Sequence, residues 1–138
     1  MGVLLAPLLA AALVAAAAGA LALQRRSQRR LVGRTVVAAS ANPHVLYFTG
    51  ESCTVCHVAQ RPALRRLSEL ASGLVIREVD VAREPELARA YRVMTLPTTI
   101  VLGRDGAVAA VNSGFAGEAL LHDQLAASGV LSAAATVA

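Results

Sequence analysis

The sequence predicts an α/β protein with a central mixed sheet flanked by helices, preceded by one N-terminal transmembrane helix. Two observations lead to this prediction. The segment from Gly2 to Leu23 contains no charged or strongly polar residue, and after it short β-rich runs alternate with helical patterns. The 138 residues leave room for one domain beside this segment, and about 100 residues are enough for a modest core.

The apolar segment is 22 residues long, and as a helix it would span roughly 33 Å, enough to cross a bilayer. A cleaved signal sequence is the alternative, since small residues such as Ala18 and Ala20 resemble a cleavage site. A signal sequence, however, has a positive region before its apolar part, and none precedes this one. A core helix would need a polar face, which the segment lacks. We therefore expect a retained single-pass anchor, in which Pro7 is tolerated.

The positive charge of the chain is concentrated next to this segment. Five arginines follow it within ten residues: Arg25, Arg26, Arg29, Arg30 and Arg34. From Thr35 onward eight arginines are balanced by nine acidic residues, so the globular part has no basic surface suited to nucleic acid. The cluster suits anionic lipid headgroups, and by the positive-inside rule it places the soluble domain in the cytoplasm. An extracytoplasmic domain is the alternative.

Four β-rich runs and three helical patterns follow the arginine cluster. The runs carry β-branched and aromatic side chains, and the helical patterns place apolar residues at three- and four-residue spacing. We expect strands at residues 45–49, 74–81, 98–102 and 107–111, helices at 53–71, 85–91 and 116–128, and a further short strand within 31–39. Pro62 lies inside the first helical pattern, so it should kink that helix or end its first segment.

The two cysteines of the chain are Cys53 and Cys56, between the first of these strands and its helix. Two intervening residues within a helical turn bring the two sulfurs within reach of a disulfide. The first cysteine then lies at the helix N-terminus, where the dipole and unpaired N–H groups stabilise a thiolate. We expect Cys53 to attack a substrate and Cys56 to resolve the mixed disulfide, in the manner of a strand–CxxC–helix unit.

A second element, Met94-Thr95-Leu96-Pro97-Thr98-Thr99, directly precedes the third expected strand. Proline is poorly tolerated inside a sheet, so Pro97 should mark the start of the strand and is a candidate for a cis bond. Placed against the cysteines, this loop would offer the main chain of Leu96 to a substrate peptide as an added strand. We expect Leu96, Pro97, Thr54 and Val55 to contact the substrate.

The segments VLYFTGESCTVCHVAQRPAL, VDV and YRVMTLPTTIVLGRDG together resemble the thioredoxin family, over about Val45 to Leu125. The resemblance implies a thioredoxin-like fold and thiol–disulfide exchange. It matches Cys53 to the nucleophilic cysteine, Cys56 to the resolving cysteine and Pro97 to the cis-proline of the family.

The chain departs from the family pattern at four places. The usual tryptophan before the first cysteine is Ser52 here, and the dipeptide between the cysteines is Thr-Val rather than Gly-Pro. The buried acid that thioredoxin carries six residues before the first cysteine falls at Tyr47, whereas Glu51 is two residues before it. Pro62 lies one residue farther from Cys56 than the helix proline of the family usually does. These changes concern substrate choice, reduction potential and proton handling.

Other site classes match some of the same residues. The sequence Cys53-Thr54-Val55-Cys56-His57 fits the CxxCH pattern of c-type haem attachment, but Met94, the one methionine besides Met1, lies in a β-rich region. A structural zinc site wants four ligands, and the spacing of His44 and His122 suggests no convergence on the cysteines. A third alternative keeps the fold as a redox sensor or binding module without turnover.

We therefore expect a thiol–disulfide oxidoreductase at the cell membrane that uses no cofactor. Its expected partners are protein disulfides or dithiols and an upstream thiol reductant, and nucleic acid is not among them. The expected organisation is an anchor at residues 2–23, a basic juxtamembrane linker at 24–34, a thioredoxin-like domain at 35–130 and a flexible tail at 131–138.

Overall fold

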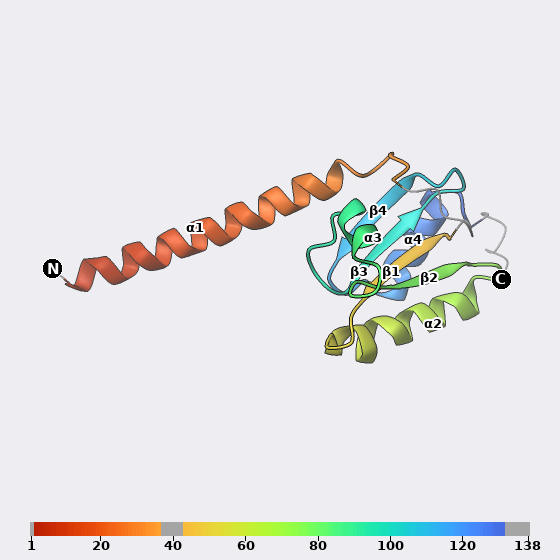
Figure 1. Cartoon of the computed structure of the whole chain (residues 1–138), viewed down its shortest axis with the longest axis horizontal. Helices are drawn as coiled ribbons and strands as arrows, with labels where there is room; N and C mark the ends of the chain where they lie inside the picture. The colour runs from red at the N-terminus through yellow and green to blue at the C-terminus, as the bar shows by residue number, and fades with distance from the viewer. Residues whose placement is uncertain (1, 37–42, 132–138) are drawn as a thin grey trace.

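The computed structural model describes residues 2–36 and 43–131, with a long helix that projects from a sheet-containing domain (Figure 1). The elements are α1 (Gly2–Arg29), β1 (Val45–Thr49), a π-helical segment η1 (Cys56–Gln60), α2 (Arg61–Leu70), β2 (Ile76–Asp80), α3 (Pro85–Ala90), β3 (Thr98–Leu102), β4 (Val108–Ser113) and α4 (Glu118–Ala127). The strands and helices expected between residues 45 and 128 are therefore all present, with ends that differ by a few residues.

The four strands form one mixed sheet in the order β2-β1-β3-β4. Strand β1 pairs in parallel with β2 and antiparallel with β3, and β3 pairs antiparallel with β4. Every residue of the two central strands, β1 and β3, is buried. Central strands covered on both faces read as continuous apolar runs rather than alternating ones, which is how Val45–Thr49 appears in the sequence.

Alternate side chains of β1 enter two separate hydrophobic clusters. Leu46 and Phe48 pack on one face with Tyr91, at the end of α3. Val45 and Tyr47 pack on the other face with residues of α2 and α4, among them Leu64, Leu67, Leu121 and Leu125. This division follows from the two-residue period of a strand, and it gives the expected arrangement of helices on both faces of the sheet.

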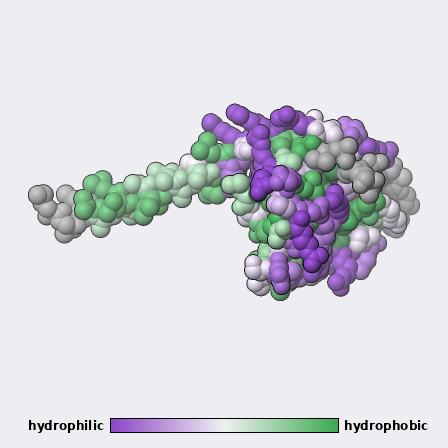
Figure 2. Space-filling view, viewed as in Figure 1, coloured by the Kyte–Doolittle hydropathy of each residue, from purple (hydrophilic) through white to green (hydrophobic). Residues whose placement is uncertain are grey.

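Helix α1 is apolar along most of its length (Figure 2). Within the described residues, the segment Leu5–Arg29 is the one helix long and apolar enough to cross a membrane, with a mean hydropathy of 2.2 over its most apolar 18 residues, none of which is buried. A membrane anchor and a signal sequence share these properties.

The chain after α1 is part of the domain. Leu31 is 3 % exposed and packs in the cluster of Leu46, Phe48 and Tyr91. The N–H of Gly33 donates to the carbonyl of Val108 over 2.7 Å, and the N–H of Val108 donates to the carbonyl of Arg34 over 3.0 Å. A strand was expected within 31–39, but residues 31–36 form no strand and make only these two backbone hydrogen bonds with Val108; residues 37–39 lie outside the described residues, as do 132–138 of the expected tail.

We predict that Leu31→Ala lowers the free energy of unfolding by about 2–4 kcal/mol, because it leaves a cavity in this cluster. Urea unfolding of the full chain in detergent, followed by the fluorescence of the two buried tyrosines, measures the change. The neighbouring Val32 is 49 % exposed, so Val32→Ala should change the value by no more than about 0.5 kcal/mol. Equal losses in the two variants would show that Leu31 does not belong to the core.

Candidate active site

The two cysteines lie where the chain leaves β1 and turns into a helix. After Thr49 the chain turns through Gly50, and the N–H of Cys53 donates to the carbonyl of Gly50 over 3.1 Å. Cys53 and Cys56 form a disulfide, with their Cα atoms 5.3 Å apart. Cys53 is half-buried, whereas Cys56 is fully buried. The pair therefore presents one sulfur toward solvent and keeps the other inside.

The Cys53 sulfur lies in a setting that favours negative charge. Helical structure begins at Thr54, so Cys53 stands at the N-terminal end of the helix. The N–H of Cys56 points at the Cys53 sulfur over 3.2 Å. Unpaired N–H groups and the helix dipole stabilise a thiolate at this position once the disulfide is reduced. Thr54 and Val55, between the cysteines, are both exposed.

Pro62 ends the first segment of the helix in an unusual way. The residues Cys56–Gln60 form a π-helical turn, in which the N–H of Arg61 reaches back five residues to the carbonyl of Cys56. The α-helix α2 then continues from Arg61 with Pro62 in its first turn, so the missing N–H of proline falls at the junction of the two helical segments. A π turn takes up one extra residue. It accounts for the additional residue between Cys56 and Pro62 that distinguishes this chain from the family pattern.

Tyr47 holds the main chain of the buried Cys56 by a hydrogen bond. Its side chain is 1 % exposed, and its hydroxyl donates to the carbonyl of Cys56 over 2.8 Å. Burial raises the pKa of Tyr47 above its ordinary value, and a hydrogen bond with Thr49 opposes this in part. Tyr47 therefore stays protonated at neutral pH and acts as a hydrogen-bond donor where thioredoxin has an acid.

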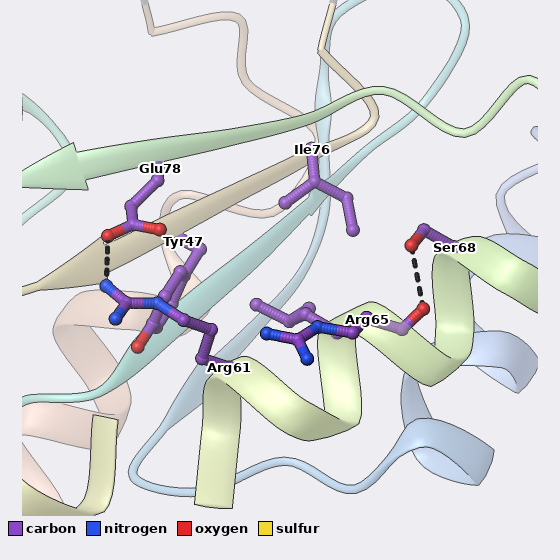
Figure 3. A pocket seen from close by; sticks show the side chains of 7 residues that line it. Tyr47, Arg61, Arg65, Ser68, Ile76 and Glu78 are labelled. Atoms are coloured by element: carbon purple, nitrogen blue, oxygen red, sulfur yellow. Dashed lines mark hydrogen bonds and ion pairs between the residues drawn. The ribbon is translucent and has the colours of Figure 1, made fainter. Parts of the chain in front are cut away.

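A chain of side chains ties the helix to the loop before Cys53. The Nε2 of His57 lies 3.0 Å from the carbonyl of Glu51, and its Nδ1 lies 3.2 Å from a guanidinium nitrogen of Arg61. A carbonyl only accepts and a guanidinium only donates, so the two contacts fit the tautomer of His57 that carries its proton on Nε2. Arg61 also pairs with Glu78 of β2 over 2.5 Å, beside Tyr47 (Figure 3). These contacts thus link the loop before Cys53 to the helix and, through Arg61, to β2.

The loop before β3 lies against the turn that carries the cysteines. The Leu96–Pro97 peptide bond is cis, as expected from the sequence. Leu96 packs in the same cluster as Cys53 and Cys56, and a Cβ added at Gly50 would lie 3.0 Å from its side chain. A glycine at position 50 is therefore what lets the two loops approach. The structure thus brings Leu96 next to the cysteine pair.

Gln60 fixes a third loop to the site, and the sequence analysis did not single it out. Its buried amide donates to the carbonyl of Ala116 over 2.9 Å and accepts the N–H of Ala116 over 2.9 Å. The signal that could have identified Gln60 is its place as a polar residue within the apolar pattern of a helix. The π turn aims this side chain inward, so the segment before α4 is held against the helix that carries Cys56.

A metal site near the cysteines finds no support among the residues that the structure describes. No three His, Cys, Asp or Glu side chains gather there in a group that could hold a metal ion. His44 accepts the N–H of Val75 through its Nδ1, at the end of β1 opposite the cysteines. His44 therefore does not join the site.

We predict that Tyr47 contributes to a loss of stability at alkaline pH. An unfolded tyrosine ionises near pH 10.0, whereas the raised pKa of Tyr47 keeps it protonated in the folded chain, so stability should fall as the pH rises above that value. At pH 8 Tyr47→Phe should cost about 1 kcal/mol for the lost hydrogen bond to Cys56. Urea unfolding of the oxidised chain at several pH values between 8 and 11 should show this deficit shrinking; parallel curves would contradict the assignment.

Comparisons with known proteins agree with this geometry. The sequence model of the thioredoxin family matches residues 33–127. No curated protein matches the chain. Thioredoxin-2, a component of the protein secretion machinery of the malaria parasite, has a TM-score of 0.55 and 27% identity over 60% of this chain and 80% of its own. The thio-disulfide isomerase of Thermus thermophilus has a TM-score of 0.51 and 27% identity over 67% and 81%. With most of its length matched by the family model, this chain belongs to the thioredoxin family.

Proposed function

We propose that this chain is a membrane-anchored thiol–disulfide oxidoreductase acting on protein substrates. The observation that carries the proposal is the Cys53–Cys56 disulfide at the start of a helix, with the Leu96–Pro97 loop packed beside it. Two similar solved structures are named as a thioredoxin and a thio-disulfide isomerase, which supports the same class of chemistry.

In the proposed reaction the reduced cysteine pair gives two electrons to a substrate disulfide. The Cys53 thiolate attacks one substrate sulfur, the substrate S–S bond breaks, and its other sulfur leaves as a thiolate. Cys56 transfers its proton to that thiolate and attacks the Cys53 sulfur. This step releases the second substrate thiolate and closes the Cys53–Cys56 disulfide. An upstream dithiol then returns two electrons by the same exchange in reverse.

The roles of the two cysteines follow from their surroundings. Cys53 is the proposed nucleophile because it is partly exposed and its sulfur receives the N–H of Cys56, whereas Cys56 is fully buried. Within the described part of the chain the main chain of Leu96 has no hydrogen-bond partner, so it is free to pair with an extended peptide. Thr54, Val55 and Pro97 complete the proposed substrate contacts.

The anchor and its sidedness are part of the proposal. We propose that α1 is retained, since Arg25, Arg26, Arg29 and Arg30 directly follow its apolar part and oppose the export of what comes after them. The domain then lies in the cytoplasm, where the surrounding thiol pool keeps cysteines reduced and the enzyme works as a reductase.

The proposal predicts different outcomes for the two cysteine variants. With dithiothreitol as reductant, the full chain in detergent should reduce insulin, and both Cys53→Ser and Cys56→Ser should lose turnover. In a separate incubation without dithiothreitol, Cys56→Ser that has been reduced beforehand should alone accumulate a mixed disulfide with the substrate, because the resolving thiolate is missing. Non-reducing gel electrophoresis detects this adduct. Ser52→Ala serves as a control that leaves the cysteines in place.

Two results would contradict the proposal, the first in its activity and the second in the roles of the cysteines. If the unmodified chain does not accelerate insulin reduction, it is a redox sensor or binding module on the same fold. If Cys53→Ser rather than Cys56→Ser accumulates the adduct, the assignment of nucleophile and resolving cysteine is reversed.

The anchor is tested on the chain recovered from cells. We expect the protein to stay in the membrane fraction after extraction with alkaline carbonate, with a mass that includes the whole of α1. Removal of residues 2–23 should release it into the soluble fraction. A mature chain shortened by the apolar segment would show that the segment is a cleaved signal sequence.

A further inference from the structure

The last turns of α1 dock on the domain through one face of the helix. Gln24 donates from its amide to the hydroxyl of Thr95 over 3.2 Å, and the amide of Gln28 donates to the hydroxyl of Ser113. Ser27, on the same face, accepts a hydrogen bond from Arg92 over 3.0 Å. Together with the buried Leu31, these side chains have the i, i+3, i+4, i+7 spacing of a single helical stripe.

The arginines of the same segment point the other way. Arg25, Arg26, Arg29 and Arg30 are all exposed, so the docked stripe and the charged stripe share one helix without mixing. A helix with this division can hold a protein domain on one side and contact anionic headgroups with the other. The connection between the apolar part of α1 and the domain is therefore a fixed joint rather than a free tether.

The joint places the domain at a definite height above the apolar segment. Gln24 is the residue after Leu23, where the apolar segment ends. At about 1.5 Å per residue, Leu31 lies only about 12 Å farther along the axis. The polar layers of a bilayer are each about 5–8 Å thick, so the loop that contacts Gln24 lies within the headgroup layer if α1 spans the membrane.

That loop is part of the proposed active site. Thr95 immediately precedes Leu96–Pro97, and Ser113 immediately precedes Gly114, whose N–H donates to the carbonyl of Pro97 over 2.7 Å. The end of α1 thus contacts both segments that hold the cis-proline. In Figure 1 the start of the helix that carries Cys56 also lies on the side of the domain toward which α1 projects.

Resting on the proposed function, we propose that Cys53 exchanges with disulfides of integral membrane proteins, on segments that lie in or next to the headgroup layer. Exposed apolar residues next to the site residues in the sequence suit this location: Val55 lies between the cysteines, Met94 is 77 % exposed, and Phe115 follows Gly114. Apolar and aromatic side chains are favoured at the membrane interface. A soluble protein would have to bring its disulfide into this narrow layer.

The electron transfer is the one already described. The Cys53–Cys56 dithiol is oxidised to a disulfide, and the disulfide of the membrane protein is reduced to two thiols. A dithiol reductant in solution or in the membrane restores the enzyme. The joint adds no chemistry to this step, but it raises the effective concentration of Cys53 at one height above the bilayer.

The test uses the full chain in vesicles of phosphatidylcholine with phosphatidylglycerol, with dithiothreitol as reductant. Two synthetic transmembrane peptides serve as probes, one with an intrachain disulfide directly after its apolar segment. The other carries the same disulfide beyond a rigid helical spacer of about 20 residues, roughly 30 Å farther out. The enzyme should reduce the near disulfide at least about tenfold faster than the distant one.

The variant inserts seven helix-forming residues between Leu23 and Gln24, which lifts the docked domain by about 10 Å without touching the stripe or the site. The matched control adds the same seven residues after Ala138. We expect the insertion to abolish the preference for the near disulfide and the control to keep it, while both reduce insulin at the rate of the unmodified chain.

The outcomes separate the two proposals. Normal insulin reduction with equal rates on the near and distant disulfides would overturn the membrane-substrate inference and leave the enzyme intact. A preference that survives the insertion would also overturn it, because height would then not matter. Failure to reduce insulin and both peptides would overturn the proposed function itself, and the inference with it.

Discussion

The spacing between Cys56 and Pro62 is the constraint on which the site depends. Proline cannot donate an N–H within a helix. Here Pro62 lies one residue farther from Cys56 than the helix proline of the family pattern does. The π turn at Cys56–Gln60 absorbs that residue. At the end of this turn Gln60 contacts Ala116, and Arg61 lies beside His57 and Glu78. One extra residue thus sets the contacts of three segments around the cysteine pair.

The same region shows how a change of residue type is accommodated. Tyr47 occupies the place of an acid in the family pattern, and its hydroxyl donates to the carbonyl of Cys56. A buried carboxylate could take a proton from the resolving thiol, whereas a tyrosine with a raised pKa cannot do so at neutral pH. The proposed reaction therefore passes the proton of Cys56 to the departing substrate thiolate. Tyr47 contributes to the position of Cys56 rather than to its ionisation.

The end of α1 docks beside the loops of the candidate site. The contacts of Gln24, Ser27 and Gln28 fall on the loops that hold Pro97, not on a distant part of the domain. Two of these hydrogen bonds join exposed side chains and contribute little energy each, so the buried Leu31 and Gln28 supply most of the stability of this joint. An apolar helix and a cysteine pair that look independent along the sequence are held in one geometry.

The sequence by itself determined the order of strands and helices, the thioredoxin fold and the CxxC pair, because hydrophobic period and motif spacing are local properties. It also indicated the cis bond at Pro97, since proline at the start of a strand is a local signal. The tertiary structure alone decided the partners of Tyr47, Gln60 and His57 and the docking of residues 24–31. These contacts join residues far apart in the chain, and the arginines that dominate residues 24–34 concealed the polar stripe between them.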